Sequence, residues 1–209
     1  MAEVVLSLDN RAHRMIDHTP SMLECIDETV RRYYTIFPNE AARHPLLRAQ
    51  VADGDELTSR RNFRGHITTS ATVLNDSATR VLLIHHKFFN LWLPPGGHYE
   101  GDASLWDSGV REVLEETGVS SAQKHPWTQL HAVPVDIDSH PIPANASRGE
   151  PAHTHHDFRF LAIASDDSAL NPQIEEVHEV RWEPVSALRN SPDTRVRALY
   201  VKLSQLNLL

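Results

Sequence analysis

The stretch that decides the fold is Leu93–Val119, LPPGGHYEGDASLWDSGVREVLEETGV, which joins a glycine-rich turn to a helix rich in carboxylates. At about 100° per residue, Glu112 and Glu116 lie one helical turn apart and Glu115 lies beside both. Like charges at this spacing destabilise an isolated helix by roughly 0.2–0.5 kcal/mol per pair, and a bound cation would remove that penalty. Carboxylate clusters without Cys or His suit Mg²⁺ and Mn²⁺, which also bind substrate phosphate. The pattern therefore predicts a divalent-metal site on this helix.

The same stretch resembles the signature of the Nudix hydrolase family. That signature is Gly, five residues, Glu, seven residues, and then Arg-Glu-aliphatic-x-Glu-Glu-x-Gly-aliphatic. Gly97 opens the match in this chain. Its second half is filled by Arg111, Glu112, Val113, Glu115, Glu116, Gly118 and Val119. Ala103 stands where the first glutamate belongs, and the nearby acids Glu100 and Asp102 do not have the spacing to replace it.

The resemblance implies an α+β protein with the Nudix fold, in which a mixed β-sheet is sandwiched between helices. It implies a hydrolase that uses Mg²⁺ or Mn²⁺ to cleave a diphosphate linkage in a nucleoside diphosphate attached to another group. The alternative is a catalytically weak Nudix-fold module that senses a nucleotide metabolite without turnover, as the departure at Ala103 suggests. The isomerase branch of the fold uses an active-site cysteine, and it is disfavoured because Cys25 lies in a predicted N-terminal helix.

Roles for individual residues follow from the same resemblance. The metal ligands are expected to be the Gly96 carbonyl, Glu112, Glu115 and Glu116, and Glu112 and Glu116 are the firmest of these. Arg111 is expected to pair with a carboxylate and to hold its orientation.

The general base is a separate question. Glu115 and the loop residue Glu176 are the two alternatives, and the family varies in this choice. Ala103 predicts fewer tightly held ions than the full signature would bind.

Composition limits the other classes of function. The chain has 209 residues and a formal net charge of −8 without a Lys/Arg-rich run, which argues against broad nucleic-acid or membrane binding. Its one cysteine excludes an internal disulfide and is compatible with a reducing compartment. No stretch approaches the roughly 18 apolar residues of a membrane span, so we expect a soluble, cytoplasmic protein.

Residues 1–60 are predicted to form a helical extension, and residues 61–209 the hydrolase domain with a C-terminal helix. The first helix is expected to end near Ile36 and to begin either at Thr19-Pro20 or at the capping pair Ser21 and Glu24. A second helix is expected over Glu40–Val51. The extension is interpreted as a cap, with a share in the substrate pocket or in a homodimer contact as the alternative.

Period-two patterns predict strands over His66–Leu74, Arg80–His85 and Trp92-Leu93, the first two forming a hairpin. His86 and Lys87 follow the second strand. They are interpreted either as contacts to the base or phosphate of the substrate or as solvated side chains at the strand end. The helix over Ser104–Thr117 is expected to be capped by Ser104 and ended by Gly118. Its apolar stripe is predicted to comprise Leu105, Val113 and the pair Val110 and Leu114, so that the carboxylates face an open site.

Later strands are predicted over Gln129–His140, Ala152–Ser165 and Val177–Trp182, with a last helix over Arg195–Leu206. A row of polar side chains shares one face of the first two of these strands. The row comprises Asp136, Asp138, His140, His153, His155, Asp157 and Arg159. A wall that recognises substrate is the favoured interpretation; a His/Asp metal site and a hydrogen-bonded structural network are the alternatives. No zinc signature such as His-Glu-x-x-His occurs in the row.

Overall fold

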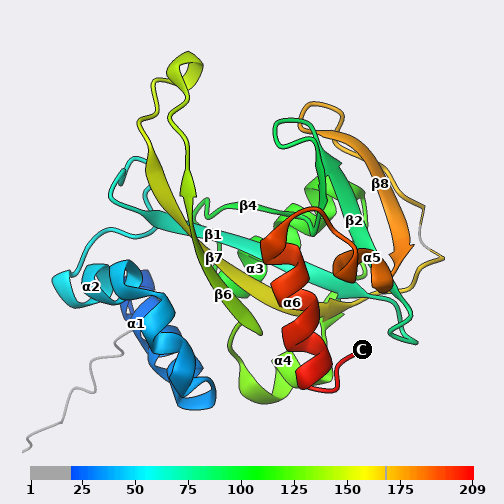
Figure 1. The fold of residues 1–209 in the computed structure, drawn as a ribbon, viewed down its shortest axis with the longest axis horizontal. Coiled ribbons are helices and arrows are strands. Elements are labelled where there is room, and N and C mark those ends of the chain that lie inside the picture. The colour runs from blue at the N-terminus through cyan, green and yellow to red at the C-terminus, as the bar shows by residue number, and fades with distance from the viewer. Residues whose placement is uncertain (1–19, 168) are drawn as a thin grey trace, which may run out of the picture.

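A mixed eight-stranded sheet forms the centre of the protein in a computed structural model that describes residues 20–167 and 169–209 (Figure 1). Its main path runs β3-β2-β1-β7-β5, while β4 pairs with β1, β6 with β7 and β8 with β2. The strands are β1 His66–Leu74, β2 Arg80–His86, β3 Leu91–Leu93, β4 Gly96–His98, β5 Gln123–Lys124, β6 Asp136–Ile142, β7 His153–Ile163 and β8 Val177–Pro184. The predicted hairpin of β1 and β2 is confirmed.

The parallel pairing of β1 with β7 sets the register of the whole sheet. It runs without a break from His66 opposite His155 to Leu74 opposite Ile163. All nine residues of β1 are buried, as expected for a central strand covered on both faces. Two strands far apart in the sequence thus place their first residues side by side.

Helices cover both faces of the sheet (Figure 1). They are α1 Met22–Ile36, η1 Pro38–Arg43, α2 Pro45–Asp53, α3 Leu105–Thr117, α4 Pro126–His131, η2 Ala146–Arg148, α5 Ser186–Arg189 and α6 Thr194–Gln205. Val113 of α3 packs in one core cluster with β1 and β2, while Val196 and Leu199 of α6 pack in another. The predicted sandwich of a mixed sheet between helices is therefore confirmed. Among the described residues, no helix has the length and apolar character needed to cross a membrane.

The N-terminal helices differ in part from the prediction. Ser21 caps α1 in a capping box with Glu24, whereas Thr19 lies outside the described residues. The helix expected from Glu40 is wrong at its start: a 3₁₀ turn occupies Pro38–Arg43, and α2 begins at Pro45. Proline has no N–H to donate inside a helix but fits the first helical position, so it begins a new helix there.

The strand predicted from Gln129 is wrong in its first half. Residues Pro126–His131 form α4, and β6 begins only at Asp136. Pro126 stands in the first turn of α4, His125 Nδ1 accepts from the Trp127 N–H at 3.1 Å, and Ala132 takes a left-handed conformation with φ 52°. These local start and stop signals override the alternating pattern.

The N-terminal helices share a core with the sheet. Ile26 and Leu47 are fully buried in one cluster with Ile137 and Phe158. At its border the Lys202 ammonium of α6 donates to Tyr33 Oη at 2.6 Å, and it lies 2.8 Å from Glu40 and 3.0 Å from Asp136. One buried amine therefore links α1, η1, β6 and α6.

Candidate active site

The glycine-rich turn and α3 form the centre of the candidate site. Gly96 and Gly97 belong to β4, which pairs with β1 so that Gly96 lies opposite Ser70. The Gly96 N–H donates to Glu116 Oε2 at 2.8 Å. A Cβ at Gly96 would lie 2.4 Å from the Ser70 Cβ, so the strand can reach this position only as glycine.

Gly97 makes room for the second carboxylate. A Cβ on Gly97 would lie 2.4 Å from Glu112 Oε1 and 2.8 Å from Oε2. The Glu112 carboxylate therefore packs directly on the backbone of the turn. On its other side, Glu112 Oε1 lies 3.0 Å from Arg111 Nη1.

Arg111 has more carboxylate partners than the sequence indicated. Its guanidinium lies 2.8 Å from Glu115 Oε2 and 3.1 Å from Asp102 Oδ1, and it donates to the His98 carbonyl at 2.8 Å. Asp102 is the residue before Ala103, and the sequence analysis gave it no role. Asp102 lies in the loop before the helix, so its contact with Arg111 could not be predicted from helical spacing.

The predicted apolar stripe of α3 is wrong in one respect. Leu114 is 47% exposed, whereas Glu112 and Glu116 are only 9% and 2% exposed. Leu105 and Val113 are buried as expected. The carboxylates turn inward because the strand beside them is glycine, which leaves space that a side chain would fill.

Burial changes the acidity of these carboxyl groups. It raises the pKa of Glu112 to about 7 against the opposing effect of Arg111, and it raises the pKa of Glu116 to about 8 against the Gly96 hydrogen bond. Two crowded, desolvated carboxylates beside a backbone strand form a donor set of oxygens only. A hard divalent cation fits these residues, because it would offset both the desolvation and the mutual repulsion.

A cavity of about 640 Å³ opens in front of this centre. Its lining includes the predicted site residues Gly96, Arg111, Glu112, Glu115, Glu176, His86, Lys87, His140, His153, His155 and Asp157. Glu116 and Asp138, the other two predicted residues, lie behind this lining. The fold thus brings residues from β2, β4, α3, β6, β7 and the loop before β8 to one cavity.

Three of these residues sit at the β2 end of the cavity. His86 Nδ1 accepts from the Phe88 N–H at 3.1 Å, so this ring supports the turn after β2. Lys87 donates its backbone N–H to the Glu176 carbonyl at 2.9 Å, and its ammonium contacts the Ile174 carbonyl. The side chain of Glu176 is left facing the cavity.

The polar row on β6 and β7 separates into two halves. In the acidic half, the buried Arg159 guanidinium lies 2.9 Å from Asp138, 3.0 Å from Asp157 and 3.3 Å from Asp136. These three carboxylates satisfy one cation, which matches the structural-network interpretation for this half. Burial raises the pKa of Asp138, but the nearby His140, with Nδ1 2.8 Å away, and Arg159 outweigh burial and lower this pKa to about 2.

The histidine half of the row gains a member from another strand. His66 at the start of β1 stacks on His153 with ring centroids 4.9 Å apart and lies 4.7 Å from the ring of His155. His66 was not among the predicted site residues, because only the long-range pairing of β1 with β7 brings it here. The sequence signal for His66 was its position as the first residue of a predicted strand.

Comparisons with known proteins agree with this geometry. Residues 65–203 match the family model described as the NUDIX domain. The m7GpppN-mRNA hydrolase NUDT17 of Bos taurus is 32% identical over 70% of this chain and 53% of its own length. A probable DHNTP pyrophosphohydrolase of Lactococcus lactis is 28% identical over 57% of this chain and 68% of its own length. The chain therefore spans about half the length of the NUDT17 protein it matches.

Among solved structures, a C. elegans Ap4A hydrolase binary complex superposes with a TM-score of 0.52. It shares 14% sequence identity, and the match covers 68% of this chain and 96% of that one. At this identity the likeness concerns the fold alone, and it agrees with the predicted sheet between helices.

Proposed function

Because this chain belongs to the NUDIX domain family, we propose that it is a metal-dependent hydrolase that cleaves a diphosphate linkage in a nucleoside diphosphate attached to another group. The observation that carries the proposal is the buried pair Glu112 and Glu116, held against the backbone of Gly96 and Gly97. Glu116 is positioned by the backbone N–H of Gly96, and Glu112 occupies the space that a side chain at Gly97 would fill.

We assign separate roles in hydrolysis to the residues of the site. Glu112, Glu116 and the Gly96 carbonyl are proposed to hold the cation, with Glu115 at the exposed edge. When bound, Mg²⁺ or Mn²⁺ neutralises phosphoryl oxygens and acidifies a water molecule. Arg111 fixes Glu112 through the fork that also contacts Asp102.

A base must also accept the proton of the attacking water. Glu115 and Glu176 both line the cavity, and they are the two proposed bases. Glu115 Oε2 lies 2.8 Å from the Arg111 guanidinium, which fixes the position of this carboxylate. Glu176 comes from the loop before β8, and its charge, like that of Glu115, acts on Glu116 and helps to raise its pKa.

Ala103 affects the number of divalent metal ions that the site is expected to hold. It lines a small separate cavity of about 160 Å³ together with Met22 and Cys25 of α1, not the large cavity. We propose, from the departure from the family signature at Ala103, that fewer ions are tightly held than the full signature would bind.

The N-terminal helices are proposed to act as a structural cap. Among the described residues 20–60, only Arg60 lines the large cavity. A homodimer contact through these helices and a cytoplasmic location stay predictions.

Turnover of a substrate panel tests the proposed function. The panel contains a capped dinucleotide, Ap4A, dihydroneopterin triphosphate, ADP-ribose and UDP-glucose, each with Mg²⁺, with Mn²⁺ and with chelator. These substrates include those named for the relatives, and the two nucleotide sugars represent a nucleoside diphosphate attached to another group. We expect metal-dependent cleavage of at least one member. Tight binding of one member without turnover of any would instead support the metabolite-sensing module.

A further inference from the structure

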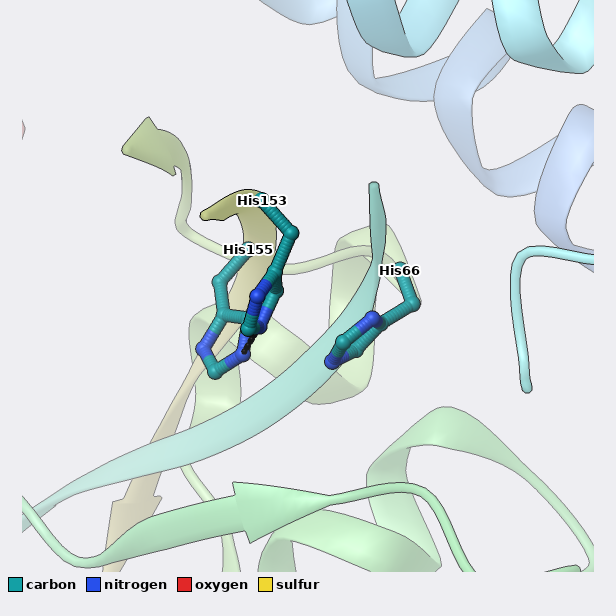
Figure 2. A group of neighbouring side chains, drawn as sticks. All are labelled: His66, His153 and His155. Carbon is teal, nitrogen blue, oxygen red and sulfur yellow. Dashed lines mark hydrogen bonds between the residues drawn. The ribbon is translucent and has the colours of Figure 1, made fainter. Parts of the chain in front are cut away.

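Three histidines gather at the start of β1 and β7, next to the carboxylate site but on different elements (Figure 2). One ring nitrogen from each of His66, His153 and His155 lies within 4.8 Å of the other two. The rings point toward one another from two parallel strands, whose register places His66 directly opposite His155. The cluster is thus built by the central pairing of the sheet.

Hydrogen bonds fix the tautomers of two of these rings. His66 Nδ1 lies 3.2 Å from the Asn62 carbonyl, and His153 Nδ1 lies 2.8 Å from the Pro151 carbonyl. A carbonyl only accepts, so each Nδ1 carries the proton and each Nε2 presents a lone pair. An imidazole whose other nitrogen donates to a carbonyl is the usual arrangement of a metal-bound histidine.

The lone pairs lack sufficient donors in the protein. His66 Nε2 is buried and has no hydrogen-bond partner. His153 Nε2 lies 3.1 Å from His155 Nε2, so a proton on His155 can satisfy only one of the two remaining lone pairs. A buried acceptor without a donor destabilises the folded protein, and a bound cation would remove this penalty.

The surroundings favour neutral imidazoles. Burial lowers the pKa of His66, and it lowers the pKa of His155 to about 2, with the neighbouring rings adding to the effect. Arg60 is the nearby cation, and it lies 3.4 Å from Glu150 at the edge of the cavity. Burial therefore favours the neutral, metal-binding form of His66 and His155, beside the geometry that brings the three rings together.

We propose that His66, His153 and His155 form a site for a divalent transition metal, with Zn²⁺ as the ion that best fits three neutral nitrogens. Imidazole suits Zn²⁺ and its neighbours, whereas the all-oxygen site on α3 suits Mg²⁺ or Mn²⁺. Zinc bonds of about 2.0–2.1 Å place tetrahedral ligands about 3.3 Å apart. His153 and His155 are already close to this separation at 3.1 Å, and the His66 nitrogen, within 4.8 Å of both, would move closer on metal binding.

A three-histidine site leaves one coordination position open. His153 and His155 line the large cavity, together with His98 and the carboxylates of α3. The open position therefore faces the same space in which the proposed substrate binds. Two metal sites of different donor chemistry would share one cavity.

Zinc titration of the tag-free protein, stripped with chelator and followed by calorimetry, tests the site. We expect one Zn²⁺ per chain that persists in a Glu112→Gln/Glu116→Gln double variant. His155→Gln and, separately, His153→Gln should weaken this binding more than about 10-fold, because even loss of a group that only positions a ligand costs roughly that much. The matched control His178→Gln, at an exposed position of β8, should bind Zn²⁺ like the parent.

Co²⁺ in place of Zn²⁺ gives a second readout that does not depend on activity. Co²⁺ bound by three histidines in a four-coordinate geometry should give an intense visible spectrum. The spectrum should be lost in His153→Gln and His155→Gln and kept in the Glu112→Gln/Glu116→Gln double variant. Each variant is first checked for an unchanged thermal unfolding curve; a variant that fails is replaced by the other histidine substitution. Absence of stoichiometric Zn²⁺ binding, or binding that the histidine variants retain, would overturn the proposal. Failure of the carboxylate site would instead appear only in the hydrolysis panel.

Discussion

Gly97 has no side chain because the Glu112 carboxylate occupies that space. In Gly97→Ala the new Cβ would lie 2.4 Å from Glu112 Oε1, so the carboxylate must move. Misplacement of a reacting group by about 1 Å can cost about 100-fold in rate. We therefore expect kcat/KM on the best panel substrate to fall by about that factor, as measured by steady-state phosphate release.

Gly109, which lies on the same helix as Glu112, is the matched control for the Gly97→Ala variant. A Cβ there would meet the Ser70 carbonyl oxygen at 3.5 Å, an ordinary contact, and φ imposes no restriction. Gly109→Ala should keep the activity and stabilise the helix by up to about 1 kcal/mol. Equal activity of the two alanine variants would show that Glu112 does not need its present position.

Arg159 is the buried counter-ion of three carboxylates, of which Asp136 is buried and Asp138 and Asp157 are partly buried, and its removal should be far costlier than its size suggests. Arg159→Met leaves Asp136, Asp138 and Asp157 without their shared partner. Breaking a buried ion pair on one side typically costs roughly 3–5 kcal/mol. We expect a loss of unfolding free energy in that range by urea denaturation.

Arg181 supplies the comparison for Arg159. It pairs with Glu179 on the exposed side of β8, where solvent screens the interaction. Arg181→Met should leave the urea midpoint nearly unchanged. A similar midpoint for both variants would mean that Arg159 does not neutralise the acidic half of the row.

At the level of elements, caps and turns were more predictable than long-range neighbours. Ser104 and Gly118 bound α3 as their residue types indicated, because capping depends on a few adjacent residues. The inward position of Glu112 and Glu116 was not predictable from the helical pattern. It depends on the glycine backbone of β4, an element that the sequence analysis took for a turn.

The histidine cluster shows the same limit. The period of two correctly placed His153 and His155 on one face of β7, since alternation is a local property. Their partner His66 comes from the parallel neighbour β1, and no local pattern encodes which strands pair. Asp102 was missed for a related reason, because a loop residue reaches Arg111 without any fixed spacing.

His44 gives the junction of η1 and α2 a pH dependence. It is buried, its Nδ1 lies 3.1 Å from Tyr34 Oη, and burial lowers its pKa, with Arg43 adding to the effect and Asp136 and Glu40 opposing it. Above about pH 6.5 both folded and unfolded His44 are neutral. Below that pH the unfolded chain binds a proton that the folded chain resists, so stability falls as the pH falls.

Unfolding free energies at pH 7.5 and 5.5 check this effect. The parent protein should lose more stability between the two values than His44→Gln, whose side chain does not titrate. The other titrating groups are common to both proteins and cancel in the comparison. An identical loss in both proteins would mean that His44 is as easily protonated in the folded chain as in the unfolded chain.

For the whole molecule, the shared core predicts that the N-terminal helices and the sheet unfold together. Ile26 and Leu47 pack with Ile137 and Phe158, and Lys202 ties both parts through Tyr33. We expect a single urea transition by fluorescence and circular dichroism, with amide exchange in α1 as slow as in β7. Two separate transitions would show that residues 1–60 fold independently of the rest.

The central claim is that Glu116 holds the catalytic cation, and Glu116→Gln tests it most directly. Glutamine keeps the size and can still accept from the Gly96 N–H, but it removes the charge. With Glu179→Gln as a control at a partly exposed position of β8, the measurements are kcat with Mg²⁺ on the best panel substrate and the unfolding curve. We predict that kcat falls more than about 100-fold with no loss of stability, since even a group that only positions a metal ligand is worth roughly 10- to 100-fold. Unchanged turnover in Glu116→Gln would contradict the account and place the metal elsewhere.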